Sequence, residues 1–305
     1  MKSTITIVTG FFYIGREKTA KADLARSTQQ YFDYFEQWAK MRNKLVVYTE
    51  PEFVEQVYQI REKFGLREKT IVIPVENVFA IEQELFDKMQ KVSDNQEFRN
   101  YRFYVNAMSN DAKYDYVMMM KYWCLQDAAK RNLIEDMAAW LDFGFNHGGE
   151  YFINPDEFDY LWEYDFSKKI HCFAFSDPQQ VLGVKNMQLQ RDCMMGAPIV
   201  LPKDLCDEFW ALVKRAMESL LWIDCIDDDQ QLVLMAIKQR PELFEVHYSD
   251  WFLPLKEYGG EHLTVKPKTA RRLPIKMVIR NILMQLTGNT NEQLFIKRVQ
   301  TFIKK

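Results

Sequence analysis

The stretch AAWLDFGFNHGG, from Ala138 to Gly149, joins an apolar run to one acid and then to a glycine-rich turn. The run is continuously apolar, which is typical of a strand buried on both faces of a parallel sheet. Asp142 stands directly after it, and the Asn, Gly and His residues that follow favour a turn. The stretch therefore predicts a buried strand that delivers Asp142 to a cleft, because ligands of α/β proteins bind beyond the carboxyl ends of strands.

Further apolar, β-branched runs bounded by polar residues extend this pattern in both directions. With residues 138–145 they predict six strands, the others at 4–12, 44–50, 69–75, 169–176 and 243–249. Amphipathic helical periods lie between them, the strongest at 204–222 after Pro202. Strands that alternate with helices predict an α/β fold with a mainly parallel central sheet.

The composition supports a large core, since 48% of the 305 residues are hydrophobic and 14% are aromatic. Charge is unevenly distributed: residues 256–305 hold eleven Lys or Arg and three Glu (net +8), and the remainder holds 29 basic and 40 acidic residues (net −11). We therefore expect an α/β domain at 1–255 and a basic helical extension at 256–305.

The basic extension has two interpretations. Residues 266–286 combine cations with apolar residues at helical spacing, so this segment either rests on an anionic membrane surface or packs on its own acidic domain. A nucleic-acid partner is disfavoured because the acidic body carries no basic-aromatic motif.

Cysteine usage and the N-terminal residues indicate a cytoplasmic protein, with association at the inner face of the membrane as an option. The five scattered cysteines favour reduced thiols over a disulfide framework or a thiolate zinc site. The apolar stretch near the N-terminus is short and β-branched, which indicates a core strand rather than a signal peptide, and no segment approaches the roughly 20 apolar residues of a membrane span.

Several enzyme classes are excluded by missing motifs. No G-x-G-x-x-G follows the first predicted strand and no G-x-x-x-x-G-K-[ST] occurs, which argues against dinucleotide-binding and P-loop enzymes. The chain also lacks G-x-S-x-G and H-E-x-x-H. What remains is a set of acids and amides at predicted strand ends.

Asp142 and His247 are the candidate metal ligands. A carboxylate on a rigid strand end could hold Mg²⁺ or Mn²⁺ bridging two phosphates, since both ions favour oxygen ligands. The alternative is an Asx-turn in which Asp142 caps the local backbone. His247 ends the last predicted strand, where it is either a hydrogen-bonded structural residue or, beside Asp142 on a neighbouring strand, a second ligand.

Further charged residues have paired interpretations. Asp227, Asp228 and Asp229 precede an apolar helical run, which is typical of a helix N-terminus; alternatively, Asp228 or Asp229 faces the cleft as a general base. Lys121 lies in an apolar helical stripe, where a lysine either extends to solvent or serves a site such as a diphosphate. Arg16 is a second phosphate candidate or an ordinary surface arginine.

Three segments and a lysine-bearing helix resemble the bacterial HtrL/YibB family. The segments are TIVTGFFYIGR at 6–16, LVVYTE at 45–50 and AAWLDFGFNHGG, and the resemblance extends to about His247. It implies a glycosyltransferase of lipopolysaccharide or capsule biosynthesis with a single Rossmann-like nucleotide-diphospho-sugar transferase (GT-A type) domain. It further implies a nucleotide-diphosphate sugar donor, a glycan or lipid-linked glycan acceptor, and Mn²⁺ or Mg²⁺ as cofactor.

The resemblance also assigns roles to residues. In that fold a D-x-D segment holds the metal and the nucleotide sugar; Asp142 matches its first acid, but Gly144 stands at the second, so metal binding is weakened, absent or shifted to Asn146 or His247. The pair Asp229–Gln230 resembles an acid-amide pair that faces the acceptor. The residues implied to line the nucleotide pocket are Thr9, Gly10, Phe11 and Glu50.

The implied chemistry leaves alternatives open. Lys121, Arg16 and any metal would stabilise the departing diphosphate, and Asp229 would deprotonate the acceptor if the reaction inverts. A non-catalytic glycan-assembly or binding protein with the same fold is one alternative, which the missing second acid supports. A nucleotide-sugar hydrolase, using a similar pocket without an ordered acceptor, is another.

Overall fold

The computed structural model describes residues 3–18, 25–101, 111–189 and 193–267. Within these ranges a single eight-stranded sheet has the order β3–β2–β1–β4–β7–β6–β8, and β5 pairs with β1 beside this path. The strands are β1 (Ser3–Phe11), β2 (Leu45–Thr49), β3 (Thr70–Pro74), β4 (Met137–Trp140), β5 (Glu163–Tyr164), β6 (Ile170–Ala174), β7 (Ile199–Pro202) and β8 (Phe244–Tyr248).

The predicted α/β class with a mainly parallel sheet is confirmed. β1 pairs in parallel with β2 and β4, as do β2 with β3 and β6 with β8. β7 runs antiparallel to both β4 and β6, and β5 runs antiparallel to β1. All six predicted strands are present, but the run from Ala138 ends as a strand at Trp140 rather than at residue 145.

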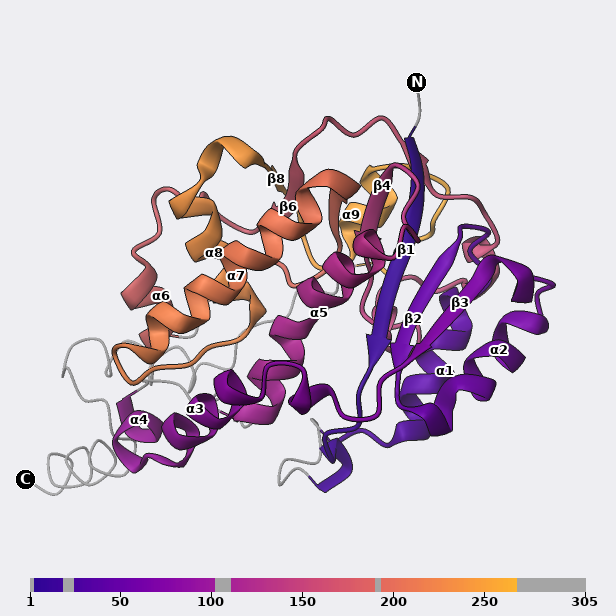
Figure 1. Cartoon of the computed structure of the whole chain (residues 1–305). Coiled ribbons are helices and arrows are strands. Elements are labelled where there is room, and N and C mark those ends of the chain that lie inside the picture. Colours follow the sequence, from indigo (N-terminus) through magenta and orange to yellow (C-terminus); the bar gives the residue numbers. More distant parts are fainter. Residues whose placement is uncertain (1–2, 19–24, 102–110, 190–192, 268–305) are drawn as a thin grey trace, which may run out of the picture.

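Helices cover both faces of the sheet and create two cores (Figure 1). One core lies between the sheet and α3, α5, α7 and α8, and the other lies between the sheet and α1, α2 and α9. The helices are α1 (Thr28–Trp38), α2 (Val54–Glu62), α3 (Gln83–Asp94), α4 (Gln96–Tyr101), α5 (Ala112–Lys130), α6 (Gly183–Leu189), α7 (Cys206–Leu221), α8 (Asp229–Gln239) and α9 (Leu253–Glu257). The helix predicted at 204–222 is confirmed as α7.

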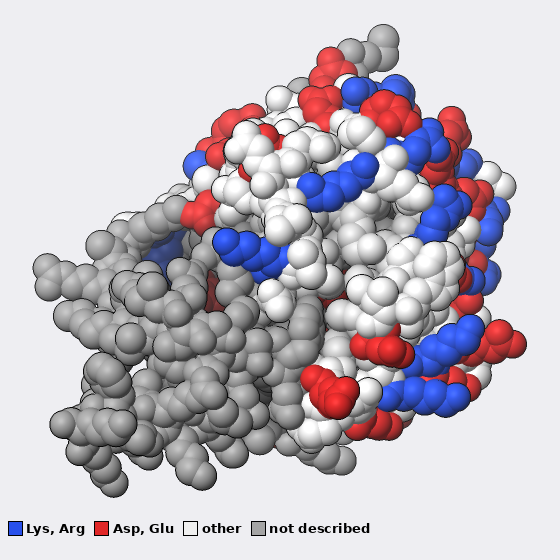
Figure 2. All heavy atoms as spheres, turned by 90° about the vertical axis from the view of Figure 1, so that its left-hand side faces the viewer, with Lys and Arg blue, Asp and Glu red and all other residues white. Residues whose placement is uncertain are grey.

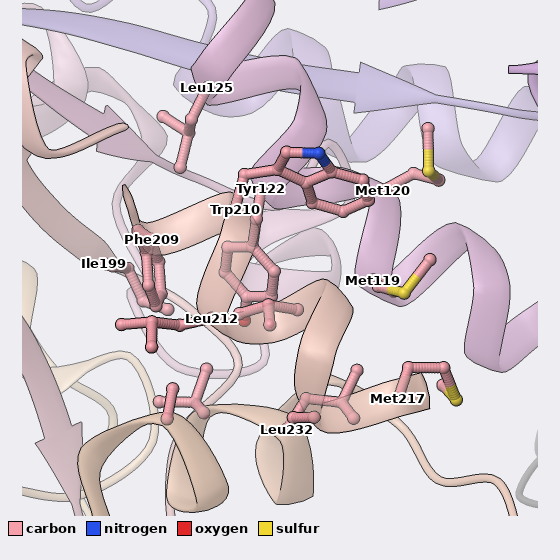
Figure 3. Packing of buried hydrophobic residues seen from close by; sticks show 14 of the residues in the cluster. Met119, Met120, Tyr122, Leu125, Ile199, Phe209, Trp210, Leu212, Met217 and Leu232 are labelled. Carbon is pink, nitrogen blue, oxygen red and sulfur yellow. The ribbon is translucent and has the colours of Figure 1, made fainter. Parts of the chain in front are cut away.

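Helix α5 brings the predicted lysine into the molecule. Its first turn is capped by Asp111, whose side chain accepts the backbone N–H of Tyr114. Figure 3 shows α5 side chains packed against α7 and α8, and Tyr122 stacks edge-on against Phe209 of α7 at 4.7 Å between ring centroids. Because α5 contacts the sheet on one side and α7 on the other, Lys121 in its middle is only 4% exposed.

The beginning of the predicted basic extension packs on the α/β domain. Leu263 is fully buried, and Val265 forms an isolated β-bridge with Phe152. Helix α9 also spans the predicted boundary between residues 255 and 256. Residues 268–305, which carry most of the predicted 266–286 helix, lie outside the described ranges. On the face shown in Figure 2, Lys and Arg are interspersed with Asp and Glu over the described surface. None of the described helices combines the length and apolarity that a bilayer crossing requires.

Candidate active site

A cleft of about 890 Å³ opens where β1 and β4 end. The two strands are parallel neighbours, with Val8 opposite Trp140, so the residues that follow them meet at one edge of the sheet. The walls come from segments distant in sequence: the end of β1, α1, α5, the loop after β4, the loop before β7, the start of α8 and the loop after β8. Polar and aromatic lining residues include Arg16, Tyr31, Tyr114, Lys121, Trp140, Asp142, Asp229, Gln230 and Trp251.

Three charged side chains meet in this cleft. The Lys121 ammonium lies 2.9 Å from Oδ1 of Asp142 and 2.8 Å from Oδ2 of Asp229. Lys121 and Asp229 are buried, whereas the Asp142 side chain is 42% exposed on the cleft wall. The indole N–H of Trp140 also donates to Oδ1 of Asp142 at 2.8 Å. One ammonium therefore joins two carboxylates that lie 87 positions apart in the chain.

The charges of this cluster are set by burial and by each other. Burial lowers the pKa of Lys121, but attraction to Asp142 and Asp229 outweighs it and raises that pKa above its ordinary value, so the ammonium stays charged. Burial raises the pKa of the Asp229 carboxyl; Lys121 lowers it and Asp142 raises it again. The net effect is that the pKa of the Asp229 carboxyl lies above its ordinary value.

The backbone of Gly196 packs closely against the Asp229 carboxylate. A Cβ atom added to Gly196 would lie 2.5 Å from Oδ2 of Asp229, closer than real Cβ atoms approach other atoms. The glycine is therefore required for this approach, and it limits the space into which the carboxylate could swing. The sequence contains Gly196 in G-A-P, yet nothing in that segment alone indicates an acid 33 positions later in the chain as its neighbour.

The glycine-rich turn after Asp142 forms a left-handed run of backbone. Asn146, His147, Gly148 and Gly149 have φ angles of 65°, 43°, 77° and 92°. The buried Asn146 amide holds this turn: its Oδ1 accepts the N–H groups of Tyr151 (3.1 Å) and Phe152 (2.7 Å), and its Nδ2 donates to the Phe152 carbonyl at 2.9 Å. Since its amide is occupied by backbone, Asn146 is a structural residue and not the substitute metal ligand suggested by the missing second acid.

Arg16 lies between two aromatic rings on the cleft wall. Its guanidinium carbon is 5.9 Å from the ring centroid of Tyr31 and 5.7 Å from that of Tyr114, and Nη1 donates to the Tyr31 hydroxyl at 2.5 Å. These contacts hold the cation at the cleft, so Arg16 is positioned there rather than free on the surface. Arg26 and Lys266 add two further cations to the lining.

The structure separates the predicted site residues into two groups. Gly10, Phe11, Arg16, Lys121, Asp142, Asp229 and Gln230 line the cleft. Thr9 is fully buried inside the sheet, and Glu50 accepts the backbone N–H of Tyr13 at 2.7 Å, so neither belongs to the lining. Asp228 caps α8 by accepting the N–H of Gln230 at 3.2 Å. Asp228 therefore caps the helix, and Asp229 is the acid of this pair that lines the cleft.

The expected pairing of His247 with Asp142 is wrong. β7 and β6 lie between β4 and β8, because the spatial order of the strands does not follow their order in the chain. His247 instead contacts His171, with Nε2 to Nδ1 at 2.8 Å, and Nε2 of His171 lies 3.0 Å from the Ser167 carbonyl oxygen. If Nε2–H of His171 donates to the Ser167 carbonyl, Nδ1 of His171 accepts from Nε2–H of His247, so both imidazoles have hydrogen-bond partners.

Among the described residues, one group has the spacing of metal ligands. It consists of His171, Glu245 and His247, whose ligand atoms lie within 4.8 Å of one another. Local sequence does not identify this group, because His171 lies on β6 and the other two residues lie on β8. Burial lowers the pKa of both imidazoles, which keeps them neutral near pH 7. The rings are nearly parallel, at 13°, and their nitrogens face each other as hydrogen-bond partners, an arrangement that needs no ion.

The cleft itself does not fit the implied Mn²⁺ or Mg²⁺. In the described ranges no third acidic, His or Cys side chain joins Asp142 and Asp229 in a metal-ligand group. One oxygen of each acid already contacts Lys121, and Gly144 offers no carboxylate. A side chain at 144 would also be crowded, because an added Cβ would lie 3.1 Å from the Tyr31 ring.

Comparisons with known proteins agree with the resemblance seen in the sequence. Residues 3–258 match the model of a family described as "Bacterial protein of unknown function (HtrL_YibB)". Protein HtrL of Escherichia coli (strain K12) is 30% identical over 292 residues, covering 89% of this chain and 98% of that protein. Two solved structures are similar at lower identity.

The crystal structure of mouse xyloside xylosyltransferase 1 in its apo form has a TM-score of 0.40 at 13% identity, over 83% of this chain and 92% of the other. PaToxG glycosyltransferase has a TM-score of 0.34 at 10% identity, over 77% and 69%. The family match covers most of the chain and includes all three segments that carry the resemblance. The chain therefore belongs to the HtrL_YibB family.

Proposed function

We propose that this protein is a glycosyltransferase that moves a sugar from a nucleotide-diphosphate donor to a bacterial cell-surface glycan, such as lipopolysaccharide or capsule. The observation that carries the proposal is the meeting of Asp142, Lys121 and Asp229 in a cleft at the carboxyl ends of β1 and β4. That edge of an α/β sheet is where nucleotides bind. The cleft volume of about 890 Å³ suits a ligand of nucleotide-sugar size.

The proposed domain has the nucleotide-diphospho-sugar transferase architecture over residues 1–255, followed by the basic extension 256–305. The family match ends at residue 258, near this boundary. A cytoplasmic location and contact of the extension with an anionic membrane belong to the same proposal, which rests on the charge difference between the two segments.

The lining residues supply the groups that sugar transfer requires. Arg16, held between Tyr31 and Tyr114, offers a fixed cation for the departing diphosphate. The half-exposed Asp142 accepts hydrogen bonds from donor hydroxyls at the cleft wall. Aromatic side chains such as Trp251 provide flat apolar surface for the faces of sugar rings.

Asp229 is the proposed general base of an inverting transfer. It is the buried acid that faces the cleft, and burial raises its pKa, which makes it a stronger proton acceptor than an ordinary aspartate. Gln230 follows it on the cleft wall and would contact the acceptor. Asp228 takes no part in this chemistry because it caps α8.

A non-catalytic glycan-binding protein is the second candidate, and Gly144 favours it because one acid of the D-x-D pattern is missing. Binding of a nucleotide sugar distinguishes the two. We expect one nucleotide-diphosphate sugar to stabilise the protein in a thermal-shift screen, by about 2.7 kcal/mol at 100 times its dissociation constant.

The stabilisation should be lost in Asp142→Ala and kept in Asp156→Ala. Asp156 is the matched control because it is 89% exposed and pairs with Lys40 outside the cleft. If no nucleotide sugar stabilises the wild-type protein, with or without Mn²⁺, the donor site is refuted and the non-catalytic candidate becomes the better one.

A further inference from the structure

We propose that Lys121 is the resident cation of the donor site, binding the donor diphosphate directly, so that neither donor binding nor transfer requires a divalent metal ion. This inference rests on the proposed function and deepens it. It departs from the metal dependence that the D-x-D resemblance implies.

The Lys121 ammonium has one donor to spare. An ammonium carries three N–H donors, and Asp142 and Asp229 take two of them. No further partner of Lys121 occurs among the described residues, although its side chain is only 4% exposed and lines the cleft. A buried cation with an unused donor at a cleft wall is suited to an anionic ligand oxygen.

The neighbours of Lys121 fix its position before a ligand arrives. Asp142 is held by the Trp140 indole N–H, and Asp229 is confined by the Gly196 backbone. The two acids thus fix the ammonium from two directions. A charge that is already oriented stabilises a departing anion without first reorganising its surroundings, which is the role that a bound metal ion fills in other active sites.

The same arrangement disfavours a divalent ion. A metal ion bound by Asp142 and Asp229 would sit beside the Lys121 ammonium, where like charges repel strongly because the surroundings are buried. It would also compete with Trp140 for Oδ1 of Asp142. Displacing the lysine is not an easy alternative, since both carboxylates raise its pKa and hold it charged in a buried position.

The transfer step balances without a metal. The bond between the anomeric carbon and the diphosphate oxygen breaks, and its electron pair leaves on that oxygen. Lys121 donates a hydrogen bond to the diphosphate and keeps its proton. The acceptor hydroxyl oxygen bonds to the anomeric carbon, and its proton passes to the Asp229 carboxylate, leaving glycoside and nucleoside diphosphate as products.

The experiment is calorimetric titration of the full chain with UDP, GDP, ADP and CDP, each in excess EDTA and each in excess Mn²⁺. We expect one diphosphate to bind with the same affinity, within about twofold, in both buffers. Lys121→Met should weaken that binding by roughly tenfold or more, as expected for loss of a charge-assisted hydrogen bond. Lys214→Met is the matched control, because Lys214 pairs with Glu82 outside the cleft.

A second variant guards against loss of folding. Lys121→Met/Asp229→Asn removes the lysine without leaving Asp229 charged and unpaired, and it should show the same weakened binding. Binding seen only with Mn²⁺, or binding unchanged in both Lys121 variants, overturns the inference and leaves the proposed function standing. Binding of no diphosphate in either buffer overturns both.

Discussion

Lys121→Met should destabilise the protein strongly, and the loss should be reversible by a second substitution. The ammonium lies 2.9 Å from Asp142 and 2.8 Å from Asp229 and is almost fully buried. Met retains most of the apolar contacts in α5, so the change mainly removes the charge. Breaking a buried ion pair from one side costs about 3–5 kcal/mol, because it leaves an uncompensated buried charge.

The assay is urea unfolding followed by tryptophan fluorescence, with thermal unfolding beside it. A loss of about 3–5 kcal/mol corresponds to a fall in Tm on the order of 10 °C for a chain of this size. Asp229→Asn in the Lys121→Met background should recover most of the loss, since it removes the charge that the first change isolates. Lys214→Met, which breaks a partly exposed pair with Glu82, should cost under about 1 kcal/mol.

The pH dependence of Lys121→Met provides an independent check. Without Lys121 the pKa of Asp229 rises further above its ordinary value of 3.8, because burial and Asp142 both raise it. The folded variant then binds a proton that the unfolded chain does not, so its stability falls as pH rises above about 4 through the folded pKa. The deficit against wild type should therefore shrink as pH falls toward about 4.

Three results would refute this account of the cluster. A loss below about 1 kcal/mol in Lys121→Met would show that the ion pairs contribute as little as surface pairs do. A further loss on adding Asp229→Asn would show that the unpaired carboxylate is not the cause. A deficit that grows on acidification would contradict the sign of the Asp229 shift.

Substitutions at Gly196, in the turn after Asp142 and in the histidine pair should each change stability. Gly196→Ala should place a methyl group against Asp229 and lower the free energy of unfolding by about 1–3 kcal/mol, measured in urea. Gly183→Ala is the control and should be tolerated, because its added Cβ would lie 3.4 Å from Nε2 of Gln231, an ordinary contact distance. Asn146→Ala should cost roughly 2–4 kcal/mol in the same assay, because it removes the buried amide and a residue suited to positive φ. Burial lowers the pKa of His247, so its stabilising contribution is present above about pH 6.5 and is lost as pH falls. His247→Gln should therefore make the free energy of unfolding depend less on pH below about 6.5. An unchanged pH dependence in this variant would contradict the prediction.

The local patterns of the sequence were sufficient for most of the architecture. β-branched runs predicted six strands, and the parallel pairing of β1 and β4 explains why Asp142 reaches the cleft. β7 (Ile199–Pro202) was not predicted, since its apolar run is only three residues long between Pro198 and Pro202. The strand β4 ends at Trp140, before the apolar run of the sequence ends. Leu141 and Phe143 extend that run because their side chains are buried in the core, although they belong to the turn that follows the strand.

Individual site residues could be predicted from their positions in the sequence. The contacts between them could not, because several elements meet at the cleft. Lys121, Asp142 and Asp229 each stood out from local context, but their contact depends on how α5 and α8 pack on the sheet. His247 was misplaced because chain order does not give strand order, and β7 and β6 intervene. The role of Gly196 depends wholly on a neighbour from α8, so local sequence could not indicate it.

The most direct test of the glycosyltransferase proposal is the release of nucleoside diphosphate from a stabilising nucleotide sugar, measured with and without a bacterial surface glycan. We expect release that depends on the glycan, appears together with a glycosylated product, and falls by about 10²-fold or more in Asp229→Asn. Release at the same rate without the glycan would instead indicate a hydrolase. If the folded wild-type protein releases no diphosphate from any nucleotide sugar in the presence of the glycan, the protein is not a glycosyltransferase.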